Sequence, residues 1–232
     1  MKNFERIVKP AVLAATSQIK DGYTIGLGSG RTMSYVIQEI GKLVMENGLD
    51  LKVVPSSYQA EILGIQNGLK VIKWTGENRV DIAIDGADQV EFKDLNMIKG
   101  GGAALTREKI LDSNAKELII VIDEKKLTDS LGLNQPVPIE IIPFGYGSIF
   151  KEVKKLGGRS ILRESDRKVG PVVTDNGNFI ADIYFTSIEH PKKLESDLKL
   201  LPGVIESGLF IEMANKIYVA KKDNKIEVIE RN

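Results

Sequence analysis

The chain contains no cysteine, and this absence excludes several kinds of site. It has no disulfide, no iron–sulfur cluster, no thiolate nucleophile and no cysteine-ligated zinc. Histidine occurs once, at His190, so a metal site with several histidine ligands is excluded and a Ser–His–Asp triad would need that one residue. Any catalysis must therefore rest mainly on carboxylates, lysine, arginine, hydroxyls and backbone dipoles.

An excess of one charge and long apolar runs are also lacking. Lys and Arg number 32 and Asp and Glu number 32, a balance that is not typical of a nucleic-acid or polybasic membrane binder. No apolar run approaches the roughly 18 to 20 residues of a membrane span, and the opening MKNFERIVKP has no apolar signal-peptide core. With 42% hydrophobic and 28% charged residues, the 232-residue chain is expected to be a cytoplasmic globular protein without nucleic-acid or membrane partners.

Short apolar stretches alternate with helical patterns in the first part of the chain. This alternation predicts a parallel sheet with helices on both faces. The expected strands are 23–27, 51–54, 70–74, 80–84 and 118–122, and the expected helices are 4–20, 32–47, 57–66 and 104–113.

The pattern changes near Gly132. From there the order of predicted elements is βαββαβ, which is the ferredoxin-like arrangement, with a hairpin turn at Asp175-Asn176-Gly177-Asn178. We expect a ferredoxin-like α+β domain at 132–208, inserted into an α/β domain formed by 1–131 and 209–232. Two tail strands, 216–221 and 225–229, are expected to return to the first sheet.

A glycine-rich turn, Gly26 to Thr32, lies between a predicted strand and a predicted helix. Glycines allow close approach of a ligand, and the free amides of a helix N-terminus favour an anion such as phosphate. The turn is not a dinucleotide fingerprint, because Arg31 stands where the third glycine would be, and no G-K-[ST] follows. An ordinary glycine turn is the simpler alternative.

Two further segments could carry chemistry. Asp85-Gly86-Ala87-Asp88 follows a strand, where its carboxylates could bind sugar hydroxyls, move protons or hold a divalent cation, or form only a solvated turn. The segment 99–108 (KGGGAALTRE) suits an oxyanion lined by amides, with Glu108 in the first turn of a helix capped by Thr106. Glu108 could also merely offset the helix dipole. The simpler role of Lys126 is a surface lysine, and that of His190 a surface or capping residue.

Together these segments resemble type A ribose-5-phosphate isomerases over nearly the whole chain. The resemblance rests on the order and spacing of five blocks: GLGSGRT (26–32), DGAD (85–88), KGGGAALTREK (99–109), VVTDNGN (172–178) and LPGV (201–204). It implies a Rossmann-like catalytic domain with a ferredoxin-like insertion, forming a homodimer or homotetramer without a cofactor. It also implies interconversion of ribose 5-phosphate and ribulose 5-phosphate in the pentose phosphate pathway.

The resemblance assigns residues as well as an activity. It places the proton acceptor on Glu108, and the substrate contacts on Ser29, Gly30, Arg31, Thr32, Asp85, Gly86, Ala87, Asp88, Lys99, Gly100, Gly101, Gly102 and Lys126. Arg31 departs from the small hydroxyl residue usual in the family. Such an isomerisation needs a base and stabilisation of an enediolate, for which Lys99 could hold the oxyanion and Asp85 could assist ring opening.

Two alternatives remain at this point. One is another enzyme on a related fold, such as a sugar-phosphate deaminase, a lactonase or a coenzyme A transferase with Glu108 as nucleophile. The other is a non-catalytic sugar-phosphate sensor, although no output module such as a helix-turn-helix is visible in the sequence. No metal is expected, for two reasons. The only ligands available are oxygen ligands such as Asp85 and Asp88, and Lys99 supplies a positive charge beside them.

Overall fold

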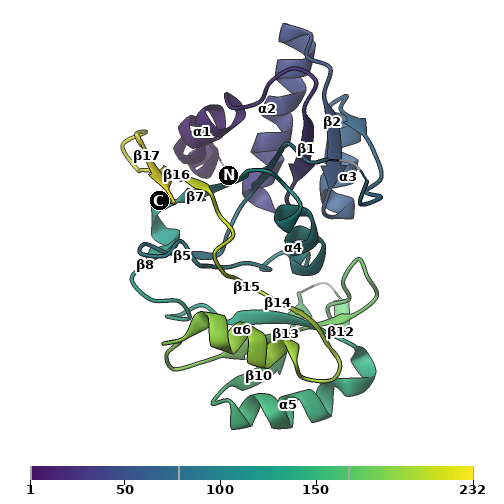
Figure 1. The fold of residues 1–232 in the computed structure, drawn as a ribbon, viewed down its shortest axis with the longest axis vertical. Coiled ribbons are helices and arrows are strands. Elements are labelled where there is room, and N and C mark those ends of the chain that lie inside the picture. The colour runs from purple at the N-terminus through teal and green to yellow at the C-terminus, as the bar shows by residue number, and fades with distance from the viewer. Residues whose placement is uncertain (1, 78, 167, 232) are drawn as a thin grey trace. The chain divides into compact units, whose positions relative to one another are not determined.

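The computed structural model describes residues 2–77, 79–166 and 168–231. Its contacts divide the chain into two compact units. The first unit comprises residues 1–86, 107–126 and 213–232, and the second comprises residues 87–106 and 127–212. Both units are therefore built from separate stretches of the chain (Figure 1).

The first unit is built on a seven-stranded sheet in the order β17-β16-β7-β4-β1-β2-β3. Every neighbouring pair is parallel except β16 and β17, so the predicted parallel sheet and the return of the tail to it are confirmed. Its strands are β1 (Thr24–Leu27), β2 (Lys52–Pro55), β3 (Lys70–Val71), β4 (Ile82–Asp85), β7 (Leu118–Asp123), β16 (Lys216–Ala220) and β17 (Ile226–Glu230).

Helices cover both faces of this sheet. α1 (Lys2–Thr16), α2 (Arg31–Asn47) and α3 (Tyr58–Gln66) share one apolar cluster with alternate strand residues such as Ile25 and Leu27. On the other face, α4 (Leu105–Ser113) places Leu111 within 3.2 Å of where a Cβ on Gly26 would stand. Packing of this kind contributes about 1.5–3 kcal/mol for each fully buried large apolar side chain. It fixes the strand ends from which the candidate site residues emerge.

The second unit contains an antiparallel sheet in the order β10-β13-β9-β14. Its strands are β9 (Val137–Ile141), β10 (Arg159–Leu162), β13 (Phe179–Tyr184) and β14 (Val204–Ser207), and its helices are α5 (Tyr146–Lys155) and α6 (Pro191–Lys199). One apolar cluster joins both helices to alternate strand residues of the sheet, among them Val137, Ile139 and Ile183. Both helices therefore pack on the same face of this sheet.

Short strands complete the second unit, and the sequence pattern did not reveal most of them. A four-stranded sheet has the order β15-β6-β5-β8, and β11 pairs with β12. Residues 204–210 form two strands divided at Gly208, where a Cβ would lie 2.3 Å from the Lys99 carbonyl oxygen, so that β15 pairs with β6 and not with the larger sheet. The bounds are β5 (Gln89–Glu91), β6 (Met97–Ile98), β8 (Leu127–Thr128), β11 (Glu164–Ser165), β12 (Lys168–Pro171) and β15 (Leu209–Phe210), with 3₁₀ turns η1 (Glu124–Lys126) and η2 (Pro143–Gly145).

Among residues 2–77, 79–166 and 168–231, no helix has both the length and the apolar character that spanning a membrane requires.

Candidate functional site

The first glycine loop connects β1 to α2 in the first unit. Gly30 is the residue before the helix and has a φ of 96°, in the left-handed region that glycine adopts readily. The helix begins at Arg31, so the amides of Arg31 and Thr32 lie in its first turn, where no intrahelical carbonyl can accept from them. The loop is therefore shaped to present amides to an anion.

Asp85 lies directly against this loop. Its side chain is fully buried at the end of β4, and its Oδ1 accepts from the amides of Gly86 at 2.6 Å and Ser29 at 3.3 Å. A Cβ at Gly28 would stand 1.9 Å from the Asp85 carboxyl carbon. Glycine at position 28 is thus what allows the carboxylate to occupy this place.

The β2–α3 turn supports the same loop, and our sequence reasoning missed it. The Ser29 hydroxyl lies 2.6 Å from the Ser57 hydroxyl and 3.0 Å from the Ser56 hydroxyl. The Gly30 amide donates to Gln59 Oε1 at 2.8 Å. Ser57 is the N-cap of α3, and a serine before a helical pattern was the available signal.

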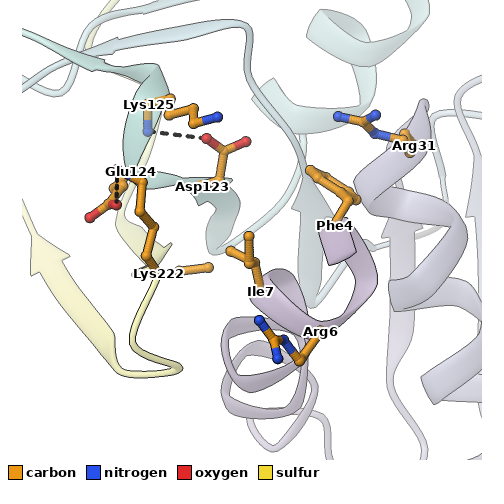
Figure 2. Close-up of a pocket in the computed structure, with 9 residues that line it drawn as sticks. Phe4, Arg6, Ile7, Arg31, Asp123, Glu124, Lys125 and Lys222 are labelled. Atoms are coloured by element: carbon orange, nitrogen blue, oxygen red, sulfur yellow. Dashed lines mark hydrogen bonds and ion pairs between the residues drawn. The ribbon is translucent and has the colours of Figure 1, made fainter. Parts of the chain in front are cut away.

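Arg31 does not turn back over its own loop. Its guanidinium stacks on the Phe4 ring of α1, 3.7 Å from the centroid. This pair lines a hollow of about 410 Å³ together with Asp123 and Lys125. Figure 2 shows the side chains that line it. Basic side chains from several elements line this hollow. The rest of the lining consists of Arg6, Ile7, Glu124, Ala220 and Lys222.

Lys126 follows β7 and ends the 3₁₀ turn η1 with its side chain half-buried. The turn begins after Asp123, whose Oδ1 accepts from the Lys125 amide at 3.1 Å. Lys125 is exposed, whereas Lys126 is partly covered. Of the two lysines, Lys126 is therefore the one more closely held by the fold.

The second glycine loop follows β6 in the second unit. Lys99 is almost fully buried, and its ammonium nitrogen lies 5.0 Å from the centre of the Phe210 ring. Gly100 has a φ of 107°, and Ala103 has a φ of 61°, which is uncommon for a residue with a side chain. Asp88 Oδ2 accepts from the Gly101 amide at 2.7 Å. Both conformation and close contact therefore require glycine in this loop.

Glu108 lies in the first turn of α4, where the sequence predicted it, and only 4% of its surface is exposed. Lys109 and Asp112 of the same helix are also buried. The prediction that Thr106 caps this helix is wrong, because α4 begins at Leu105 and the Thr106 hydroxyl donates to Glu140 Oε2 at 2.5 Å. The hydroxyl thus donates to a buried carboxylate, whereas a helix cap would accept from a free amide of the helix N-terminus.

The predicted residues divide between the units. Asp85 and the first loop meet in the first unit, and Asp88 and the second loop meet in the second. The first unit holds Ser29, Gly30, Arg31, Thr32, Asp85, Gly86, Glu108 and Lys126, and the second holds Ala87, Asp88, Lys99, Gly100, Gly101 and Gly102. His190 lies exposed at the start of α6. Within the described parts of the chain, no group of three or more histidines, cysteines or carboxylates is placed to hold a metal.

Comparison with known proteins identifies the family. A sequence model described as ribose 5-phosphate isomerase A (phosphoriboisomerase A) matches residues 52–224. The chain belongs to this family. The ribose-5-phosphate isomerase A of Methanococcus aeolicus is 45% identical over 221 residues, covering 95% of this chain and 93% of the relative. That of Thermococcus kodakarensis is 44% identical over 218 residues, covering 94% of this chain and 95% of the relative.

Solved structures of ribose 5-phosphate isomerases share the fold. The enzyme from Methanocaldococcus jannaschii superposes with a TM-score of 0.93 at 39% identity, covering 99% of this chain and 100% of that one. A D-ribose-5-phosphate isomerase in complex with phospho-erythronic acid gives a TM-score of 0.94 at 40% identity, covering 98% and 99%. The resemblance drawn from the five sequence blocks is confirmed.

Proposed function

We propose that this chain interconverts D-ribose 5-phosphate and D-ribulose 5-phosphate, moving one proton between C2 and C1 through an enediolate. Family membership over nearly the whole chain carries this proposal. The phospho-erythronic acid bound by a relative supports it, because that compound is a sugar-acid phosphate whose carboxylate resembles the charge of an enediolate.

Glu108 is the proposed base. A carboxylate suffices for proton transfer next to a carbonyl, which fits a chain with one histidine at the start of α6. The helix dipole favours the ionised form of a first-turn carboxylate, whereas burial of Glu108 favours the neutral form. These opposing effects suit a group that must accept a proton and release it again.

The second glycine loop is the proposed site of enediolate stabilisation. Lys99 is buried and brings a positive charge to a segment rich in backbone amides. An amide or ammonium donor aimed at a developing oxyanion is typically worth about 2.7–4 kcal/mol. Gly100, Gly101 and Gly102 leave the chain without side chains at the point where a sugar would approach. Asp85 is proposed to assist ring opening, and Asp88 with Gly86 and Ala87 to contact the sugar.

The phosphate is proposed to bind at the start of α2. The Ser29 and Gly30 amides already donate to Asp85 and Gln59, so the first-turn amides of Arg31 and Thr32, the Thr32 hydroxyl and Lys126 are its main donors. With its guanidinium on Phe4, Arg31 contributes through its backbone. This position holds the phosphate by fixed dipoles and one full charge.

The proposal also covers the domain organisation, the oligomeric state, the cofactor requirement and the cellular location. The strand order β10-β13-β9-β14, with two helices on one face, supports a ferredoxin-like insertion at 132–208 in a Rossmann-like domain formed by 1–131 and 209–232. We further propose a cytoplasmic homodimer or homotetramer that needs neither cofactor nor metal. The absence of cysteine fits a reducing compartment.

The decisive experiment incubates the protein with ribose 5-phosphate alone and follows ketose formation. Glu108→Gln should lower kcat by about 10²- to 10⁴-fold, the usual contribution of a general base, because the amide is nearly isosteric but cannot accept the proton. Glu61→Gln is the matched control, since Glu61 lies in the first turn of α3 and should leave kcat unchanged.

Other outcomes would point to other functions. Near-normal kcat in Glu108→Gln would remove Glu108 as the base. A requirement for acyl-coenzyme A would indicate a transferase, and binding of the sugar phosphate without turnover would indicate a sensor. Activity lost to a chelator and restored by magnesium would contradict the metal-free mechanism.

A further inference from the structure

The antiparallel sheet of the second unit has two chemically different faces. Residues Val137, Ile139 and Ile141 of β9 point toward α5 and α6. Because side chains alternate along a strand, Glu140 points to the opposite face. Asp182 of β13 alternates in the same way with Ala181 and Ile183, which belong to the apolar cluster. The face away from the helices therefore carries two carboxylates.

Glu140 is fully buried and accepts hydrogen bonds from four side chains. The donors are Thr106 Oγ1 at 2.5 Å, Thr174 Oγ1 at 2.8 Å, Asn178 Nδ2 at 2.8 Å, and Asn176 Nδ2 at 3.0 and 3.2 Å to the two oxygens. Burying a carboxylate is costly unless hydrogen bonds replace its water. The three donors from 174–178 supply that replacement, and Thr106 connects Glu140 to the first turn of α4.

Arg163 makes a second connection from the same sheet. Its Nε donates to Asp182 Oδ2 at 2.9 Å, and its Nη2 donates to Asp182 Oδ1. Its Nη1 donates to the carbonyl oxygens of Gly100 at 2.7 Å and Gly101 at 3.0 Å. The planar guanidinium thus joins the sheet to the backbone of the second glycine loop, which a lysine could not do with the same geometry.

Both connections end on one short segment, residues 99–106. Three consecutive glycines make this segment costly to order, because glycine loses the most backbone freedom on folding. Arg163 holds the segment by two of its carbonyls, and Glu140 holds it at Thr106. Glu108 lies in the same helix, two residues after Thr106.

We propose that Glu140 and Arg163 are positioning residues for the isomerisation, acting through Thr106 and through the carbonyls of Gly100 and Gly101. The inference rests on the proposed roles of Lys99, the loop amides and Glu108. Displacing a catalytic group by 1 Å can cost about 10²-fold in rate, so a flexible loop that carries such groups needs fixed anchors. The block at 172–178 then has a function, as the source of three of the four side chains that hold Glu140.

Thr106→Val tests this inference, because it removes only the hydroxyl that Glu140 accepts from. We expect kcat to fall by about 10- to 100-fold, while KM for ribose 5-phosphate stays within about twofold. Thr106→Ser keeps the hydroxyl and should restore kcat to within about threefold. Affinity for phospho-erythronic acid should fall with kcat, whereas competition by inorganic phosphate should be unchanged, since phosphate binds elsewhere.

Thr16→Val is the matched control. Thr16 is buried even more completely than Thr106, and its hydroxyl donates to the Val12 carbonyl within α1 at 2.9 Å. This variant should lose stability and keep kcat. If Thr106→Val does not fold, Arg163→Lys provides the second test with the same expected split between kcat and KM.

The inference is overturned if Thr106→Val keeps its kcat, if Thr106→Ser loses as much as Thr106→Val, or if affinities for phospho-erythronic acid and inorganic phosphate fall together. Different results are expected if the proposed function itself is wrong. In that case Glu108→Gln retains its activity or the unaltered chain does not isomerise ribose 5-phosphate.

Discussion

Two glycine-rich loops lead into helices in this chain, and one aspartate of the same four-residue turn lies against each of them. Asp85 contacts the first loop through the Ser29 amide, and Asp88 contacts the second through the Gly101 amide. The first loop is held further by neutral groups only, because Gln59 and the Ile84 carbonyl accept from its amides and Ser56 and Ser57 contact its Ser29 hydroxyl. It runs into first-turn amides suited to an anion. The second is held also at its carbonyls and at Thr106 by charged groups of a sheet.

In the proposed site, the difference between the loops separates two tasks, binding of the phosphate and stabilisation of the enediolate. A phosphate takes no part in bond breaking, so the first loop needs donors more than rigidity. An enediolate gains its stabilisation only from donors already in place, so the second loop needs to be rigid. Changes in the first loop should therefore act mainly on binding, and changes in the second mainly on turnover.

The largest effect is expected from Gly28→Ala. The new Cβ would stand 1.9 Å from the carboxyl carbon of Asp85, a buried side chain that is already hydrogen-bonded and cannot move aside cheaply. We expect a loss of about 3 kcal/mol in the free energy of unfolding, at the upper end for overpacking, measured by urea denaturation.

Substitutions of two glycines in the second loop serve as comparisons for this prediction. Gly102→Ala meets no atom within 4 Å and should change stability by less than about 0.5 kcal/mol. Gly101→Ala should fall between the two, because its Cβ would lie 2.6 Å from the end of the Asp88 side chain. Equal losses in Gly28→Ala and Gly102→Ala would mean that close approach of Asp85 does not explain the first loop.

Lys126→Ala should have an intermediate effect on kcat/KM, limited to the phosphorylated substrate. Losing one charge-assisted hydrogen bond, worth about 1.5–3 kcal/mol, should lower kcat/KM for ribose 5-phosphate by about 10- to 100-fold. Slow turnover of unphosphorylated ribose should remain nearly unchanged. An equal loss on both sugars would place Lys126 in the chemistry or in folding, and the contrast between the two loops would fail.

Gln59→Ala should have the smallest effect, and in the opposite direction. Removing its carbonyl releases the Gly30 amide, which a phosphate could then use. Since a typical hydrogen bond contributes about 0.5–1.5 kcal/mol, the inhibition constant of inorganic phosphate should fall by about two- to tenfold. Gln38→Ala, at an exposed position of α2, should leave it unchanged. A weaker phosphate inhibition in Gln59→Ala would instead make Gln59 a phosphate contact.

Much of the first unit could be predicted from the sequence, because its strands and helices follow the chain in a regular alternation. The apolar stretch at 118–122 became β7, and the tail joined it as β16. The hairpin turn at 175–178 is also confirmed, with the Gly177 amide donating to the Thr174 carbonyl and Val173 bridging to Phe179. Local signals of this kind need no knowledge of distant residues.

The contacts that hold the loops could not be predicted, because they join residues far apart in the chain. Nothing in the spacing of Glu140 indicates that Thr106 and the 174–178 turn converge on it. The strands β5, β6, β8 and β15 have two or three residues each, too few for a periodic pattern. Family resemblance supplied the proposed site residues, but it did not reveal that Glu140 and Arg163 contact the segment that carries several of them.

The place of β16 in the first sheet has a consequence for how the chain folds. β16 pairs with β7 in parallel, residue Lys216 beside Ile119, and stands between β7 and β17. Until the last part of the chain has been synthesised, the apolar strand β7 is an open edge, with a row of backbone groups that another chain could pair with. Such long-range pairing is slow because the loop must close first. We expect the nascent chain to be most prone to aggregation in the interval between synthesis of β7 and arrival of β16, when a chaperone would help it most.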